Sequence, residues 1–185
     1  MKRILVIDNG TGAMDSIKDS LKRYSYTILK YQKFKAEHAQ GFTHIILTGG
    51  DHWATKRKFS EEVKLIRNPP APILGICLGM QIIGISFDST LKKLGKEITN
   101  NHEISIVKKN SLFEGLPKKI TVYQYHEYGF HMVGNDLTVL AQSPHCIEAV
   151  VHKTLPVWGV QFHPEVIHEG KREGRKIIRR FLSFR

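Results

Sequence analysis

Cys77 stands in a pattern that suits a nucleophile. It lies between two glycines in PILGICLGMQ (72–81), at the end of an apolar run. A buried structural cysteine needs no such glycines. A nucleophile at the tip of a strand-to-helix turn does, because side chains at Gly75 and Gly79 would collide as the two backbones approach. The following helix would favour a thiolate and aim its first N–H groups, including that of Leu78, at an oxyanion beside the sulfur. A small core residue beside a loose turn is the alternative, so the interpretation requires a base.

A candidate base follows in GVQFHPEV (159–166), where one proline separates His163 from Glu165. Residues two apart in extended backbone project to the same side, and Pro164 keeps His163 out of helical backbone. A carboxylate beside an imidazole fixes its tautomer and stabilises the imidazolium, as in a catalytic triad. A surface histidine is the alternative. A metal site using His168 as well is not expected, because the histidine and cysteine spacing matches no zinc pattern.

A third element is LTGGDH (47–52), where an expected strand ends in two glycines. A loop of this kind lets bare backbone N–H groups approach a ligand closely. A second oxyanion donor near Gly50 would complete the site, although a simple turn explains the glycines equally well.

The elements needed to position these residues are strands alternating with helices in the first half of the chain. That alternation is typical of a parallel sheet covered on both faces. The second half has strand patterns with few helices, which favours an antiparallel or mixed extension. With no linker or repeat, we expect one α/β domain over residues 1–185, with a mostly parallel, flavodoxin-like central sheet. The expected strands are 3–8, 26–31, 44–49, 71–77, 103–109, 119–126, 137–143, 146–152 and 156–163, and the expected helices are 14–24, 60–68, one opening behind Cys77 and one within 169–185.

The composition limits the class of protein. Two cysteines cannot form a disulfide framework, and they are expected to be free thiols in a reducing cytoplasm, with Cys146 a core thiol. The N-terminal apolar run breaks at Asp8, so no signal peptide is expected, and no stretch approaches the roughly 18 apolar residues of a membrane span. We therefore expect a cytoplasmic protein that does not enter a membrane.

The formal net charge is +11, and much of it lies in residues 169–185. Apolar residues keep helical spacing there while arginines and lysines occupy the other face, which predicts a solvated helix packed by its apolar stripe. A docking surface for an acidic partner is the alternative. A nucleic-acid partner is not expected, because no aromatic interleaving or known binding module accompanies the charge.

Taken together, GICLGMQ, QFHPE and TGGD resemble the class I glutamine amidotransferase domain, also called the triad or G-type glutaminase, over nearly the whole chain. The resemblance implies that Cys77 is the nucleophile, His163 the general base and acid, and Glu165 its orienting carboxylate. It implies that the backbone N–H groups of Leu78 and Gly50 form the oxyanion hole. The substrate glutamine would contact Gln81 and, as a weaker expectation, His126 in YHEYGF.

The implied reaction is hydrolysis of L-glutamine to glutamate and ammonia through a γ-glutamyl thioester, without a cofactor or metal. Ammonia made in this way is normally delivered to a synthetase. Because the chain has no phosphate-binding loop of the G-x-x-x-x-G-K-[ST] type, a separate ATP-dependent synthetase subunit is expected as partner.

Within the family, residues 139–166 look most like the glutaminase subunit of GMP synthase in its separate-subunit form. GICLGMQ and DNGTGAMDSI are also similar to the corresponding subunit of imidazole glycerol phosphate synthase, so the ammonia acceptor stays open, with an anthranilate-type acceptor among the alternatives. A stand-alone γ-glutamyl hydrolase and a non-catalytic regulatory module on the same scaffold are further alternatives.

Overall fold

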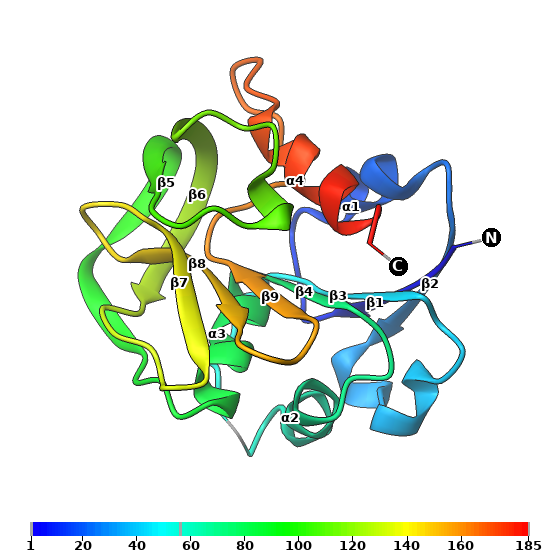
Figure 1. The fold of residues 1–185 in the computed structure, drawn as a ribbon. Coiled ribbons are helices and arrows are strands. Elements are labelled where there is room, and N and C mark those ends of the chain that lie inside the picture. The colour runs from blue at the N-terminus through cyan, green and yellow to red at the C-terminus, as the bar shows by residue number, and fades with distance from the viewer. Residues whose placement is uncertain (1, 56, 185) are drawn as a thin grey trace.

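The computed structural model describes residues 2–55 and 57–184, which form one continuous nine-stranded mixed sheet with helices on both faces (Figure 1). Its strand order is β2-β1-β3-β4-β9-β8-β7-β5-β6. The strands are β1 (Arg3–Asp8), β2 (Ser25–Lys30), β3 (His44–Leu47), β4 (Ile73–Ile76), β5 (Lys92–Ile106), β6 (Lys119–Gly129), β7 (Leu137–Gln142), β8 (Ile147–His152) and β9 (Val157–Val160). The helices are α1 (Met14–Leu21), α2 (Ser60–Arg67), α3 (Leu78–Ser86) and α4 (Glu173–Phe181), with short 3-10 helices η1 (Tyr31–Lys33), η2 (Ala36–Ala39) and η3 (Ser111–Phe113).

The sheet divides into a parallel and an antiparallel part. Strands β2, β1, β3, β4 and β9 pair in parallel, whereas β9, β8, β7, β5 and β6 pair antiparallel. The expected α/β class and the antiparallel extension are therefore confirmed. The sheet is less parallel than expected, because four of its eight strand pairings are antiparallel.

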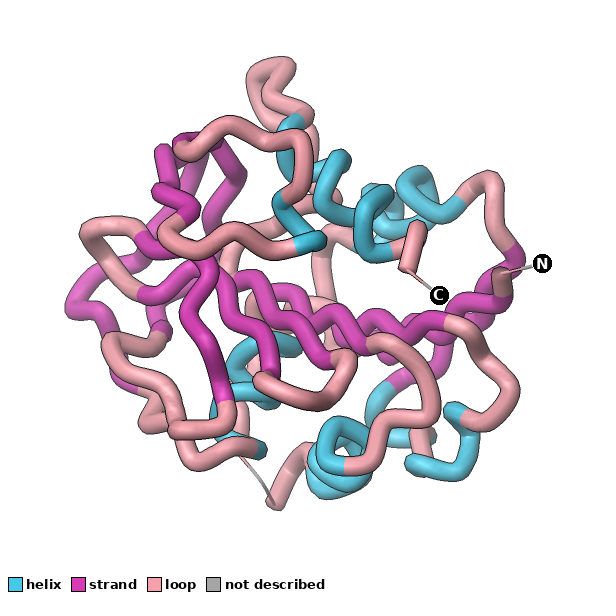
Figure 2. Tube along the Cα trace, viewed as in Figure 1, coloured by secondary structure: helices cyan, strands magenta, loops and turns pink. Residues whose placement is uncertain are grey.

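Alternation along β1 divides the core between the two faces of the sheet. Ile4 and Val6 pack with α1 and α4 on one face, and Leu5 and Ile7 pack with α2 and α3 on the other. Figure 2 shows the same arrangement, with helices on either side of the central strands. A strand buried on both faces must be apolar throughout, which explains the continuous apolar runs of the first half.

The longest strand was only partly predicted. β5 spans Lys92–Ile106, whereas the expected strand began at residue 103. Its first part is polar and mostly solvated, and a register shift separates the pairs formed by Lys93 and Ile98. Such a segment lacks the apolar alternation by which strands are recognised. β5 pairs with β6 along most of its length, so these two strands form the far edge of the sheet.

The basic C-terminal segment forms α4 as predicted, and its apolar stripe packs on the core. Ile177, Ile178 and Phe181 are buried, whereas Lys176 and Arg179 are exposed. Among the described residues, no helix combines the length and apolar character that a bilayer span requires.

Candidate active site

The carboxyl ends of parallel strands gather the candidate residues at one edge of the sheet. Cys77 directly follows β4 and donates its N–H to Val160, the last residue of β9, over 2.8 Å. His163 lies three residues beyond β9, and its N–H donates to the Tyr123 carbonyl of β6, also over 2.8 Å. Because Gly49 follows β3, three strands far apart in the sequence bring their ends together, which is where ligands bind in open α/β sheets.

Cys77 occupies a strained backbone conformation between β4 and α3. Its φ of 49° and ψ of −106° are rare for a residue with a side chain, and such strain is characteristic of functional positions. The flanking glycines allow the turn, since a β-carbon on Gly75 would lie 2.5 Å from the Gly79 carbonyl carbon. The predicted strand–turn–helix geometry around the cysteine is therefore present.

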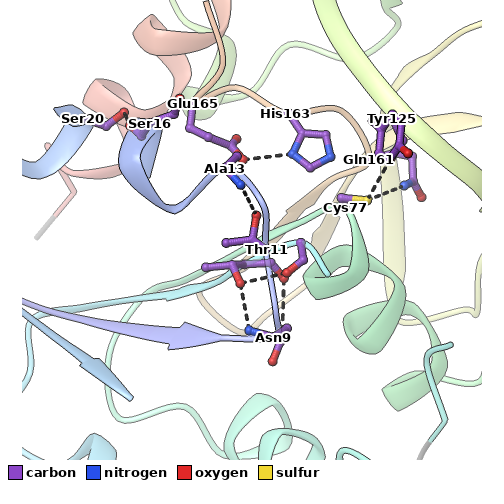
Figure 3. A network of polar contacts seen from close by, with 12 residues as sticks. Asn9, Thr11, Ala13, Ser16, Ser20, Cys77, Tyr125, Gln161, His163 and Glu165 are labelled. Atoms are coloured by element: carbon purple, nitrogen blue, oxygen red, sulfur yellow. Dashed lines mark hydrogen bonds and ion pairs between the residues drawn. The ribbon is translucent and has the colours of Figure 1, made fainter. Parts of the chain in front are cut away.

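His163 and Glu165 form the predicted pair. His163 Nδ1 lies 2.9 Å from Glu165 Oε1, and both side chains are buried (Figure 3). A carboxylate at Nδ1 makes that nitrogen the donor and leaves Nε2 free, and Nε2 has no hydrogen-bond partner among the described residues. Burial alone would lower the pKa of His163, but the charges of Glu165 and Cys77 raise it well above its usual range.

Gly49 lies between the cysteine and the histidine. A β-carbon at Gly49 would lie 3.0 Å from His163 Cε1 and 3.4 Å from Cys77 Cβ. The imidazole and the thiol are thus brought together across this bare backbone, and Figure 3 shows the two side chains in the same small region. The raised pKa of His163, to which the Cys77 sulfur contributes by charge and hydrogen bonding, favours an imidazolium beside a thiolate.

A pocket of about 290 Å³ opens beside the sulfur. Its wall includes Gly50, Cys77, Gln81 and His126, so four residues predicted from three separate motifs border one cavity. Aromatic and acidic side chains complete it. They are Asp51, His52, Trp53, Glu97, Tyr125, Glu127 and Tyr128.

Two backbone N–H groups meet the structural requirement for oxyanion donors. Leu78 begins α3, where the first N–H groups have no partner within the helix. Neither the Leu78 nor the Gly50 N–H donates to another residue in the part of the chain that the structure describes. A β-carbon on Gly50 would lie 2.0 Å from the Asn9 carbonyl oxygen, so only glycine fits where this turn packs against β1.

Gln161 is a residue of the site that the sequence analysis missed. Its Nε2 donates to Cys77 Sγ over 3.7 Å, and its Oε1 accepts from Gln81 Nε2 over 3.4 Å. The Cys77 thiol in turn contacts the Tyr125 carbonyl over 3.8 Å (Figure 3). The signal for Gln161 was present, because it stands two residues before His163 and extended residues at that spacing share a side.

His126 lies in a buried polar group beside the pocket rather than on an open surface. Burial lowers its pKa to about 4, and its Nδ1 lies 3.0 Å from the Tyr128 carbonyl, which also accepts from Gln81. The ring is therefore neutral near pH 7, and it supports the strand that carries the pocket wall.

Three potential metal ligands converge where the sequence predicted none. The ligand atoms of His126, Cys146 and Glu148 lie within 4.8 Å of one another, and all three side chains are buried. Burial raises the pKa of Cys146 and of Glu148, which keeps both groups protonated and neutral. Cys146 bonds Glu148 at 3.7 Å, so the predicted core thiol is buried but has a polar partner.

Arg175 connects α4 to the acidic member of the pair. Its Nε donates to the Glu165 carbonyl oxygen over 2.6 Å, and its guanidinium pairs with Asp19 of α1. No local sequence pattern indicates this contact, because it joins residues on three separate segments.

Known proteins share this fold and sequence pattern. A family model for glutamine amidotransferase class-I matches residues 5–183. The chain is 33% identical to the glutamine-hydrolyzing subunit of GMP synthase from Pyrococcus furiosus, covering 97% of each chain, and 32% identical to its counterpart from Methanocaldococcus jannaschii, covering 97% and 96%. A solved structure from Thermoplasma acidophilum has a TM-score of 0.89 at 30% identity, covering 98% and 92%. A glutamine amidotransferase from Thermotoga maritima has a TM-score of 0.74 at 26%, covering 89% and 76%.

Proposed function

Because this chain belongs to the glutamine amidotransferase class-I family, we propose that it is the glutaminase subunit of a GMP synthase and hydrolyses L-glutamine to glutamate and ammonia. The observation that carries this proposal is the buried His163–Glu165 pair beside Cys77, a strained residue at a strand-to-helix turn that opens on a pocket. The relatives of nearly equal length support the choice of acceptor.

In the first half of the reaction, the Cys77 thiolate attacks the side-chain carboxamide carbon of glutamine. The new C–S bond turns the carbonyl into an oxyanion, which the N–H groups of Leu78 and Gly50 stabilise, each contributing roughly 10²–10³ in rate. The His163 imidazolium gives its Nε2 proton to the amide nitrogen. The C–N bond breaks, and ammonia leaves with a γ-glutamyl thioester on the enzyme.

In the second half, the neutral imidazole of His163 takes a proton from water at Nε2 while the water oxygen attacks the thioester. Collapse of the tetrahedral intermediate breaks the C–S bond, which releases glutamate and restores the thiolate–imidazolium pair. Glu165 stays charged throughout and holds the ring by Nδ1. No step calls on a metal or an organic cofactor.

Gln81 and His126 hold the substrate and its surroundings. Gln81 lines the pocket on the first turn of α3, where its amide is shared between the Tyr128 carbonyl and Gln161. Glutamine entering the pocket exchanges these bonds for bonds to its own polar groups. Neutral His126 keeps the Tyr128 carbonyl in place for that exchange.

The ammonia passes to a separate, ATP-dependent synthetase subunit. We place both subunits in the cytoplasm, where the free thiols of Cys77 and Cys146 stay reduced. We further propose that residues 1–185 are one domain and that its parallel half is flavodoxin-like, since the order β2-β1-β3-β4-β9 follows the 2-1-3-4-5 pattern of that fold.

The test is glutamine hydrolysis by the purified chain, alone and with a candidate GMP synthetase subunit, its nucleotide substrate and ATP. We expect weak glutaminase activity alone, a large increase with the complete mixture, and no activity from Cys77→Ala. Full-rate hydrolysis of γ-glutamyl compounds without a partner would instead indicate a stand-alone hydrolase. Stimulation only by another synthetase would indicate a different acceptor.

A further inference from the structure

A buried polar cluster of Asn9, Thr48 and Glu62 adjoins the Gly49–Gly50 turn and has no role in the reaction steps above. Asn9 and Thr48 are fully enclosed, and Glu62 is only 2% exposed. Asn9 follows β1 and Thr48 follows β3, while Glu62 belongs to α2. The cluster therefore lies at the same edge of the sheet as the candidate active site.

Asn9 and Thr48 hold the glycine turn through four contacts. The Asn9 N–H donates to Thr48 Oγ1 over 2.9 Å, and Asn9 Nδ2 donates to the Thr48 carbonyl over 3.1 Å. Thr48 Oγ1 donates to the Gly49 carbonyl over 2.9 Å. The Asn9 carbonyl packs so closely on Gly50 that a β-carbon there would lie 2.0 Å away. A change in the position of Asn9 must therefore move the turn that carries the Gly50 N–H.

Two acceptor atoms in this cluster lack a donor. Asn9 Nδ2 donates to Glu62 Oε2 over 3.3 Å. Asn9 Oδ1 and Glu62 Oε1 are both buried, and neither has a partner among the described residues. Buried polar atoms without partners are costly and rare. A single proton on Glu62 removes both defects, because Oε1–H then donates to Asn9 Oδ1 while the amide donates to Oε2.

The surroundings of Glu62 agree with a protonated acid. Burial raises the pKa of Glu62 to about 8, and the Asn9 hydrogen bond offsets only part of that rise. α3, which packs against α2, carries no titratable side chain between Leu78 and Ser86. The other neighbouring segments carry Asp8, Glu37, His38, His52, Lys58 and Glu61, and none of these contributes to the shift.

We propose that Glu62 is a positioning residue: as a neutral carboxylic acid it pairs with the Asn9 amide and so holds the Gly49–Gly50 turn, and loss of its proton releases that turn. This inference rests on the proposed function, because the Gly50 N–H matters to catalysis only if an oxyanion forms beside Cys77. Releasing the turn misplaces a transition-state contact, so kcat is expected to fall about 10-fold or more while KM changes little.

The kinetic test compares wild type with Glu62→Gln, using Glu61→Gln as the matched control. Glutamine reproduces both hydrogen bonds of the protonated acid but carries no titratable proton. Glu61 is the adjacent carboxylate and pairs with Lys64 on the outer face of α2. Glutaminase kinetics are measured with the synthetase present, from about pH 6 to about pH 10.

In wild type and in Glu61→Gln we expect kcat to fall around pH 8. In Glu62→Gln that inflection should vanish, leaving only the alkaline limb set by His163. Three results would overturn the proposal: an unchanged inflection in Glu62→Gln, loss of its activity at every pH, or failure of this variant to fold.

A second measurement needs no glutamine. Infrared difference spectra of the intact chain report the carbonyl band of a protonated carboxyl group. We expect wild type to lose one such band between about pH 7 and about pH 9, and Glu62→Gln to lack it. Absence of the band in wild type at pH 6 contradicts the inference. Presence of the band in a chain that never hydrolyses glutamine would leave Glu62 protonated and refute the glutaminase proposal instead.

Discussion

His163 contacts Glu165 through Nδ1 at 2.9 Å, and its Nε2 has no partner among the described residues. The ring is therefore oriented on one side and free on the other, which is the arrangement a general acid and base requires. The charge of Glu165 also helps to raise the pKa of His163, so the imidazolium persists to higher pH than for a free histidine.

Glu165→Gln should lower kcat by about 10²–10⁴-fold, because an amide can donate to Nδ1 and hold the wrong tautomer. The pKa of His163 should fall without the nearby negative charge, so the alkaline limb of kcat/KM should move to lower pH. Steady-state glutaminase assays across pH measure both effects. An unchanged alkaline limb would show that Glu165 does not set the charge of His163.

Gly75→Ala should destabilise the fold by about 1–3 kcal/mol or more, because the new β-carbon would overlap the Gly79 backbone at the cysteine turn. Gly12→Ala is the matched control, since a β-carbon there meets no atom within 4 Å. Urea unfolding of both variants measures the difference. Equal stabilities would mean that the strand and helix do not approach as closely as described.

Arg175→Ala should lower kcat by about 10-fold with little change in KM, since the Glu165 backbone loses its hydrogen bond to Arg175 and the triad carboxylate shifts. Arg179→Ala on the exposed face of α4 is the control and should behave as wild type. Kinetics and thermal unfolding of the two variants distinguish loss of positioning from loss of folding. Equal kinetics in both variants would remove Arg175 from the account.

Glu62 should make stability depend on pH. Because its folded pKa lies near 8 and an unfolded glutamate titrates near 4.5, the folded state holds the extra proton between these values. The free energy of unfolding contributed by this group therefore falls as pH rises through that window, by about 1.4 kcal/mol per pH unit, and is constant above it. The stability advantage of Glu62→Gln over wild type should grow from pH 5 to pH 8. A constant difference would contradict the raised pKa.

Much of the fold was predictable because its signals are local. Buried strands such as β1 and β4 are apolar throughout, and a glycine-flanked turn leads from β4 into α3. The first part of β5 was missed because it is polar and pairs only with the edge strand β6. The balance between parallel and antiparallel pairs was misjudged for a related reason: strand patterns do not state which neighbour each strand takes.

The site divides in the same way. Cys77, His163 and Glu165 were found from short-range patterns, and the structure brings them together with Gly50, Leu78, Gln81 and His126 at one edge of the sheet. Arg175 and the Asn9–Glu62 pair act across distant segments, so no spacing in the sequence reveals them. The pairing of such groups is a property of the packed chain.

The central claim is that Cys77 carries a γ-glutamyl thioester during turnover, and mass spectrometry of acid-quenched reactions tests it most directly. Wild type mixed with glutamine and its synthetase partner should show a γ-glutamyl adduct on the peptide that contains Cys77, and Cys77→Ala should show none. An adduct on Cys146 instead, or rapid glutamine hydrolysis by Cys77→Ala, would contradict the account.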